Sequence, residues 1–315
     1  MLQTLDFNRR FYEQKVAPMI RSRFPEYEDR IAAGVAGEGS DCFGYDDGLS
    51  RDHDFGTGVC LWLTEEDYGR IGPMLSIAYN ELVDAAEGGS ALTVRLRDRR
   101  GVMKIRSFYS NVLGIDCDTA ACVMTEEQWT ELDHTCLATA VNGEIFRDDL
   151  GEFSRFRKYL LGYYPDTIWK TRLIEELHRF SSAAQVNYAR CMTRRDLVAA
   201  EQCRLRGLEA AMELIFLLYR TYPPYYKWTY RALTELETEA PYAEWIGELA
   251  VTKSDPAAWE GRGYHPDHIN TADRVIVLTE RIAEGIAKEL RKHGLTERTD
   301  PYLEIYCDEI LSGLY

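Results

Sequence analysis

The pattern of apolar residues changes near the middle of the chain, and this change limits the folds that the chain can adopt. Residues 1–150 combine glycine-rich turns with short β-branched runs, a pattern typical of short strands connected by helices. Residues 151–315 show helical periodicity almost throughout, so they predict a helical bundle. The length of 315 residues is comfortable for two domains. We therefore expect an α+β fold with a small α/β domain at 1–150 and an all-α domain at 151–315.

Three stretches of the first half predict strands. Ile31–Val35 and Phe55–Leu63 are short apolar runs that lie on either side of a glycine-rich segment. Residues 91–109 alternate apolar and polar side chains around the turn Asp98-Arg99-Arg100-Gly101, which is a hairpin signature. The second arm of this hairpin is expected to be a strand over Val102–Phe108.

Helices are predicted where apolar residues recur at a spacing of three or four. One such segment covers Glu65–Ala86, and Pro18 is expected to end or kink an earlier one near the N-terminus. In the second half, the expected helices cover about 152–162, 166–190, 194–221, 225–238, 271–293 and 301–313.

The composition excludes several classes of protein. A formal net charge of −15 gives no general attraction for a phosphate backbone, so we expect no binding to long nucleic acids. The longest strongly apolar stretch, Met212–Tyr219, is too short to span a membrane. The eight cysteines form no Cys-x-x-Cys pair, and the first residues, MLQTLDFNRRFYEQK, are charged too early for a signal peptide. We therefore expect a cytoplasmic protein with reduced thiols.

Glycine and aspartate gather in one segment, GEGSDCFGYDDGLSRDHDFG, at residues 37–56. Both residue types favour turns, so such a cluster is commonly a solvated loop. The spacing favours another interpretation, because Asp52 and Asp54 at i and i+2 of a strand point to the same face. Two adjacent carboxylates repel each other unless a cation neutralises them, and Mg²⁺ prefers oxygen ligands completed by substrate phosphates. About a dozen residues earlier, Gly39 and Ser40 offer backbone amides and a hydroxyl to a phosphate.

These residues resemble the signature of the polymerase-beta-like nucleotidyltransferase superfamily, in which Gly-Ser after a first strand is followed by Asp-x-Asp on the next. The matching residues are Gly39, Ser40, Asp52 and Asp54. A small α/β domain followed by a helical one is also similar to the aminoglycoside and lincosamide nucleotidyltransferases. The chain also resembles an uncharacterised bacterial branch of that superfamily, and this resemblance covers most of its length. It is carried by three strings: residues 37–56, FRDDLGEFSRFRKYLLGYYPDTIWKTRL and YPPYYKW.

The resemblance implies a fold and a mechanism. The fold is a small nucleotidyltransferase-type mixed sheet with helices, followed by the helical domain. Asp52 and Asp54 would be the catalytic residues and would hold Mg²⁺ on the triphosphate of ATP or another NTP, while Gly39 and Ser40 hold its phosphates. A hydroxyl of a small molecule or a protein would attack the α-phosphorus, and pyrophosphate would leave. Two alternatives remain open: a non-catalytic nucleotide-sensing or partner-binding module, and a structural helical protein that binds no nucleotide.

The sequence departs from the superfamily pattern in two ways. His53 stands between the two carboxylates, where an apolar residue is usual. The superfamily's third carboxylate, on a later strand, is absent from Val102–Phe108. The acids that lie nearby in the sequence are Asp98, Asp116, Asp118, Glu144, Asp148 and Asp149. The last three could supply the missing base, or they could cap a helix that starts near residue 151.

The segment Tyr222–Trp228, with the sequence YPPYYKW, has two interpretations. In one, Lys227 reaches a phosphate of the nucleotide and the rings form a wall for its base. In the other, which we favour for the rings, the prolines set an interhelical turn and the rings fill the core. Lys227 is kept as a candidate nucleotide-binding residue.

Other basic and metal-ligating residues give weaker signals. Four basic residues have two interpretations: they face the phosphates of a ligand, or, as is more common for such charges, they form a solvated helix face. They are Arg155, Arg157, Lys158 and Lys170. His265 and His268 are spaced for a zinc pair, but Pro266 and Asp267 favour a surface loop. Cys117 and Cys122 match no common zinc spacing and are expected to be small buried residues.

Overall fold

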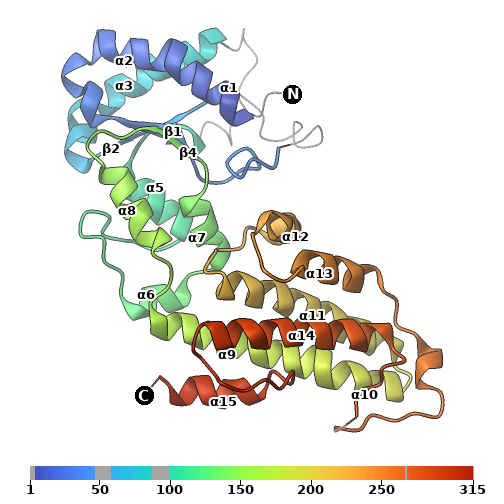
Figure 1. Ribbon diagram of the computed structural model, residues 1–315. Helices are drawn as coiled ribbons and strands as arrows, with labels where there is room; N and C mark the ends of the chain where they lie inside the picture. The colour runs from blue at the N-terminus through green and yellow to red at the C-terminus, as the bar shows by residue number, and fades with distance from the viewer. Residues whose placement is uncertain (1–3, 47–57, 87–98, 267, 315) are drawn as a thin grey trace. The chain divides into compact units, whose positions relative to one another are not determined.

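The computed structural model describes residues 4–46, 58–86, 99–266 and 268–314. The chain divides into two compact units, Met1–Tyr163 and Tyr164–Tyr315 (Figure 1). Helix α8 (Glu152–Leu161) belongs to the first of these units, whereas the sequence-based division at residue 150 assigns it to the second.

The first unit is built on a four-stranded mixed sheet with the strand order β3-β2-β1-β4. Strand β1 (Ala32–Val35) pairs in antiparallel fashion with both β2 (Cys60–Leu63) and β4 (Glu144–Arg147). Strand β3 (Gly101–Lys104) pairs with β2 in parallel. Together with the surrounding helices, this sheet confirms the α+β class.

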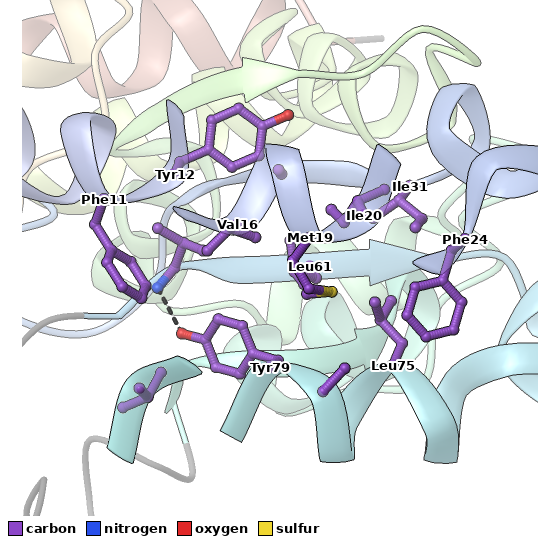
Figure 2. Packing of buried hydrophobic residues seen from close by; sticks show 14 of the residues in the cluster. Phe11, Tyr12, Val16, Met19, Ile20, Phe24, Ile31, Leu61, Leu75 and Tyr79 are labelled. Carbon is purple, nitrogen blue, oxygen red and sulfur yellow. Dashed lines mark hydrogen bonds between the residues drawn. The ribbon is translucent and has the colours of Figure 1, made fainter. Parts of the chain in front are cut away.

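Apolar side chains cover both faces of β2. Leu61 and Leu63 belong to a buried cluster with residues of the N-terminal helices and of α3 (Glu65–Ala86), which Figure 2 shows. The side chain between them, Trp62, packs in the opposite direction, because side chains alternate along a strand. Its ring stacks on Phe153 of α8 with a centroid separation of 3.9 Å. Burial on both faces explains why Cys60–Leu63 is an uninterrupted apolar run rather than an alternating one.

The N-terminal helices form a nearly continuous helical segment. Helix α1 (Thr4–Phe11) leads into a π-helical turn, Tyr12–Val16, and then into α2 (Ala17–Arg23). Pro18 lies in the first turn of α2, directly after the π-helical turn. The chain therefore accommodates Pro18 by a change of helix type, and the helical path ends at residue 23, before the 3-10 helix Pro25–Arg30.

Three predicted elements of the first half are present in the structure. Strands β1 and β2 lie within the runs Ile31–Val35 and Phe55–Leu63, and α3 has both of the expected ends. Residues 87–98, which include the first arm of the predicted hairpin, lie outside the described residues.

The expected strand over Val102–Phe108 is confirmed for Val102–Lys104 and is wrong from Ile105 onward. Strand β3 ends at Lys104, and the chain continues as helix α5 (Ile105–Leu113). Ile105, Phe108 and Tyr109 are buried at a helical spacing of i, i+3 and i+4, and this periodicity outweighs the alternation that predicted a strand. Arg106 consequently lies on a helix.

The rest of the first unit contains three short elements that the sequence analysis did not identify. Helix α6 (Glu126–Glu131) begins with a capping box formed by Thr125 and Gln128. Helix α7 (His134–Val141) is capped by Asp133. Strand β4 follows and leads to α8, at whose start the backbone N–H groups of Gly151 and Ser154 donate to the Asp148 carboxylate.

The named elements of the second unit are helices, as predicted. They are α9 (Asp166–Phe180), the π-helical segment Ser181–Asn187, α10 (Tyr188–Thr193), α11 (Leu197–Leu218), α12 (Tyr226–Glu235), α13 (Tyr242–Val251), the 3-10 helix Pro256–Trp259, α14 (Arg274–Lys292) and α15 (Ile305–Ser312). Each segment expected to be helical from residue 166 onward contains at least one of them, and α13 and the 3-10 helix Pro256–Trp259 are additional. Within the described residues, no helix is both long and apolar enough to cross a membrane.

Gln185, in the π-helical segment of the second unit, donates hydrogen bonds to a half-buried carboxylate. The Gln185 amide donates to both Glu280 carboxylate oxygens at 3.2 and 3.0 Å and to the Pro301 carbonyl at 2.9 Å. Burial, with further contributions from Glu284 and Asp300, raises the pKa of Glu280 from 4.5 to about 7. The folded protein therefore binds a proton at Glu280 more tightly than the unfolded chain does.

This raised pKa makes stability depend on pH in a defined direction. The contribution of Glu280 to the free energy of unfolding is greatest below pH 4.5 and falls as the pH rises towards about 7. We expect Glu280→Gln to stabilise the protein by about 2–3 kcal/mol at pH 8 and by less at pH 5.5. Urea unfolding at both pH values measures this difference. Glu237→Gln, at an exposed site of the same unit, is the control, and an equal gain at both pH values for Glu280→Gln would contradict the prediction.

Candidate functional site

The strand pairing brings four segments of the first unit to one end of the sheet. Gly34 pairs with Cys60, so the end of β1 lies beside the start of β2. Cys60 pairs with Gly101, and Val35 pairs with Glu144, so β3 and β4 also start at this end. The segments that meet here are 36–40, 58–59, 99–100 and 142–143. We refer to this end of the sheet, with these segments, as the candidate site.

The chain leaves β1 in a compact turn that requires glycine. Gly37 and Gly39 have φ angles of +107° and +124°, which L side chains rarely adopt. The turn is closed by backbone hydrogen bonds from Cys42 to Gly39 (3.2 Å) and from Tyr45 to Ser40 (2.8 Å). These bonds occupy the carbonyl groups of Gly39 and Ser40.

A run of free backbone amides follows β1. The N–H groups of Glu38, Gly39, Ser40 and Asp41 donate no hydrogen bond to any described residue, and the Ser40 hydroxyl makes none either. Glu38 is exposed, and Gly39 and Ser40 are half-buried, so solvent reaches this run. Consecutive free amides in a turn form a concave donor surface that binds anions. The residues predicted to hold phosphate, Gly39 and Ser40, therefore lie in a segment with the donors that this role requires.

A buried ion pair lies beneath this turn. The Arg100 guanidinium donates to the Asp41 carboxylate at 2.9 Å and to the Cys42 sulfur at 3.0 Å. It also donates to the Ala36 carbonyl at 3.3 Å. The side chains of Arg100 and Asp41 are only 2% and 8% exposed, so this pair is shielded from solvent. Arg100 thus joins the start of β3 to both ends of the amide run.

The ion pair determines the charge of the turn. Burial lowers the pKa of Arg100, but Cys42 and Asp41 raise it more, so the pKa lies well above its ordinary value and the guanidinium remains charged. The Arg100 charge offsets that of Asp41, which would otherwise repel an anion bound to the neighbouring amides. Burial also raises the pKa of the Cys42 thiol. Cys42 is therefore a neutral hydrogen-bonding group here and is not a nucleophile.

The structure describes some of the predicted site residues and not others. Gly39 and Ser40 lie in the turn after β1, whereas Asp52, His53 and Asp54 lie outside the described residues. Gly58, which follows them in the chain, is described, and its backbone N–H donates to the Asn8 side chain at 3.1 Å.

Lys227 belongs to the second unit, in the first turn of α12. Its side chain is exposed, and its amine lies 4.5 Å from the centroid of the Trp228 ring. The two interpretations of YPPYYKW each apply to part of this segment. Tyr222 is buried and packs edge-on against Tyr164 at 5.2 Å, as a core plug would. Tyr225 and Tyr226 are exposed, with ring centroids 4.4 Å apart.

The candidates for a third carboxylate have partners in the structure, apart from Asp98, which lies outside the described residues. Asp116 forms a bidentate pair with Arg106, with contacts of 2.9 and 2.5 Å. Asp148 accepts from the Ser154 N–H at 2.7 Å, which confirms the capping alternative for this residue. The remaining three pairings are Asp118 with the Ala120 and Ala121 amides, Glu144 with Arg9, and Asp149 with Arg147.

The weaker sequence signals receive structural roles. Arg157 donates to the Val141 carbonyl at 2.5 Å, and Arg155 and Lys170 form ion pairs with Glu152 and Asp166 on their own helices. His265 and His268 form an isolated β-bridge with their rings in edge-on contact. No group of three or more His, Cys, Asp or Glu side chains that could hold a metal ion is present in the described part of the chain.

Sequence analysis missed Arg100, Asp41 and Asn142 as parts of this site. It assigned Arg100 to a hairpin turn and made no assignment for the other two. The hydrogen bonds that bring them together connect residues 59 and 105 positions apart. The one local signal is that Asp41 directly follows Ser40.

Comparison with known proteins finds a similarity over about a third of the chain. A family model described as a domain of unknown function (DUF4037) matches residues 129–229. This match supports the expected resemblance to an uncharacterised family, and it includes α7, β4 and α8 of the first unit. No curated protein and no solved structure matches the chain.

The Arg100–Asp41 pair leads to a stability prediction. Arg100→Met would leave the Asp41 carboxylate buried without its counter-charge, so we expect a loss of about 3–5 kcal/mol in the free energy of unfolding. The additional substitution Asp41→Leu should recover part of this loss, because it removes the unpaired charge. Urea unfolding of the two single variants and the double variant measures the coupling between the residues.

Arg23→Met is the matched control for this cycle. Arg23 pairs with Glu81 at 2.8 Å, and the two side chains are 48% and 61% exposed, so the loss should stay below about 1 kcal/mol. Equal losses for the Arg23 and Arg100 variants would show that the buried pair does not hold the turn.

Proposed function

We propose that the first unit is a nucleotide-binding domain of the nucleotidyltransferase type, and that the protein transfers a nucleotidyl group to a hydroxyl. The observation on which this proposal rests is the run of free amides from Glu38 to Asp41, located where β1 ends beside the start of β2. The Gly39-Ser40 sequence, the later Asp-x-Asp and the mixed sheet support the same interpretation.

Each residue has a role in the proposed reaction. The amides of Gly39 and Ser40 and the Ser40 hydroxyl bind the β- and γ-phosphates of the NTP, with ATP the expected nucleotide. Asp52 and Asp54 hold Mg²⁺, which neutralises charge on the entering and leaving oxygens when it is bound. Lys227, a residue of the second unit, stays a prediction from the sequence.

The chemical step is an in-line displacement. The hydroxyl oxygen of the acceptor forms a bond to the α-phosphorus as the bond from that phosphorus to the bridging oxygen of the β-phosphate breaks. Pyrophosphate leaves, and the hydroxyl proton passes to solvent or to a base. The acceptor is a small hydroxylated molecule or a protein, because a net charge of −15 disfavours long nucleic acids.

A second function, nucleotide sensing without turnover, has one structural observation in its favour. Five of the six carboxylates considered for the third position are described, and each is engaged with a cation or with a backbone amide. A domain that binds nucleotide without a free base would still need the phosphate-binding turn.

The site of action that we propose is the cytoplasm. All eight cysteines are free, including the buried Cys42, Cys60 and Cys117, which is the pattern expected where thiols stay reduced.

Two variants test the proposed roles in binding and catalysis. Wild-type protein should bind Mg-ATP in calorimetry, and Ser40→Ala should weaken this binding about tenfold, the cost of one hydrogen bond to a charged group.

Asp54→Asn should lower pyrophosphate release at least about 100-fold, because a metal ligand is lost. Release is measured with polyhydroxylated small molecules as acceptors, and α-labelled ATP is used to detect labelling of the protein itself.

Asp29→Asn, at an exposed site outside the candidate site, is the control and should behave like the wild type. Binding without release for the wild type would favour the sensor. The absence of Mg-ATP binding by folded wild-type protein would eliminate both functions.

A further inference from the structure

Asn142 holds the first residue of the turn after β1 through two hydrogen bonds. Its side-chain oxygen accepts from the Gly37 N–H at 2.9 Å, and its side-chain amide donates to the Gly37 carbonyl at 2.8 Å. Both backbone groups of Gly37 are thereby fixed by one side chain. The peptide that follows Gly37 contains the Glu38 N–H, which is the first of the free amides, so the orientation of that donor depends on Asn142.

The backbone around Asn142 is itself held firmly. Gly143 has a φ of +71°, and a Cβ at this position would lie 1.9 Å from the Val35 carbonyl oxygen, so the turn into β4 is in close contact with the end of β1. Arg157 of α8 donates to the carbonyls of Val141 at 2.5 Å, Asn142 at 3.4 Å and Gly143 at 3.5 Å. The Asn142 side chain therefore extends from a fixed backbone, with α8 behind it.

The two supports of the free amides act at different points. Arg100 contacts Ala36 and Cys42, which flank the run, and the side chain of Asp41, its last residue, and it contributes charge. Among the described residues, the Asn142 side chain forms hydrogen bonds with Gly37 only, and it contributes no charge. Removal of Asn142 should therefore change the direction of the amides without changing the electrostatic potential of the turn.

From these contacts we infer that Asn142 is a positioning residue that orients the Glu38–Asp41 amides towards the phosphates of the nucleotide. The identity of the ligand rests on the proposed function, whereas the restraint on Gly37 does not. Asn142 and Arg157 both lie within residues 129–229, which match the family model, whereas the turn that they support lies outside that match. Asn142, in the matched segment, thus acts on a site that is formed by the turn after β1.

The experiment compares Asn142→Ala with Thr125→Ala, a variant that removes the cap of α6 in the same unit. Affinities for Mg-ATP and for inorganic pyrophosphate with Mg²⁺ are measured by calorimetry. Asn142→Ala should weaken both by the same factor, tenfold or more, because the amides contact only phosphate. Thr125→Ala, with a comparable loss of melting temperature, should leave both affinities within twofold of wild type.

Amide hydrogen exchange gives a readout that needs no ligand. In Asn142→Ala, exchange at Gly37, Cys42 and Tyr45 should accelerate at least tenfold, while amides of β2 and α3 stay as protected as in the wild type. Uniform acceleration across the first unit would indicate a merely structural role and would overturn the inference. Unchanged exchange and unchanged affinity in Asn142→Ala would also overturn it. If wild-type protein binds neither ATP nor pyrophosphate, the proposed function fails, and the exchange data still decide whether Asn142 restrains the turn.

Discussion

The pairing of β1 with two antiparallel neighbours determines where a functional site can form in the first unit. Because β1 runs against both β2 and β4, and β3 runs with β2, the chain that leaves β1 meets the starts of the other three strands. Burial of β2 on both faces, by Leu61 on one side and Trp62 on the other, holds this arrangement in place. The free amides after β1 therefore lie on a rigid support.

The turn after β1 combines anion-binding donors with a compensated negative charge. Asp41 alone would oppose a phosphate, but Arg100 lies against it in a site closed to solvent, where charges interact strongly. The Arg23–Glu81 pair, in which both side chains are about half exposed, is screened by water and contributes much less. This contrast explains why we assign the organising role to Arg100 and Asn142, the residues that contact the backbone and buried side chains of the turn.

Local patterns predicted those parts of the fold in which one interaction dominates. The apolar run of β2, the periodicity of α3 and the helices of the second unit follow from spacing alone. The prediction was wrong at Ile105, where alternation and helical periodicity overlap in the same residues and tertiary burial decides between them. For the site, Gly39 and Ser40 were identifiable from local sequence, because glycine permits the backbone that exposes amides. Arg100 and Asn142 were not, because their roles depend on contacts between segments far apart in the chain.

The backbone amides from Glu38 to Asp41 are proposed to bind phosphate. An amide-resolved NMR titration with inorganic triphosphate and Mg²⁺ measures this binding at each N–H and does not rely on turnover. We expect saturable shifts that are largest at Gly39, Ser40 and Asp41, with smaller shifts at Gly37 and Cys42. Saturable shifts confined to other segments, or no shift at these amides at millimolar triphosphate, would show that the turn does not bind phosphate.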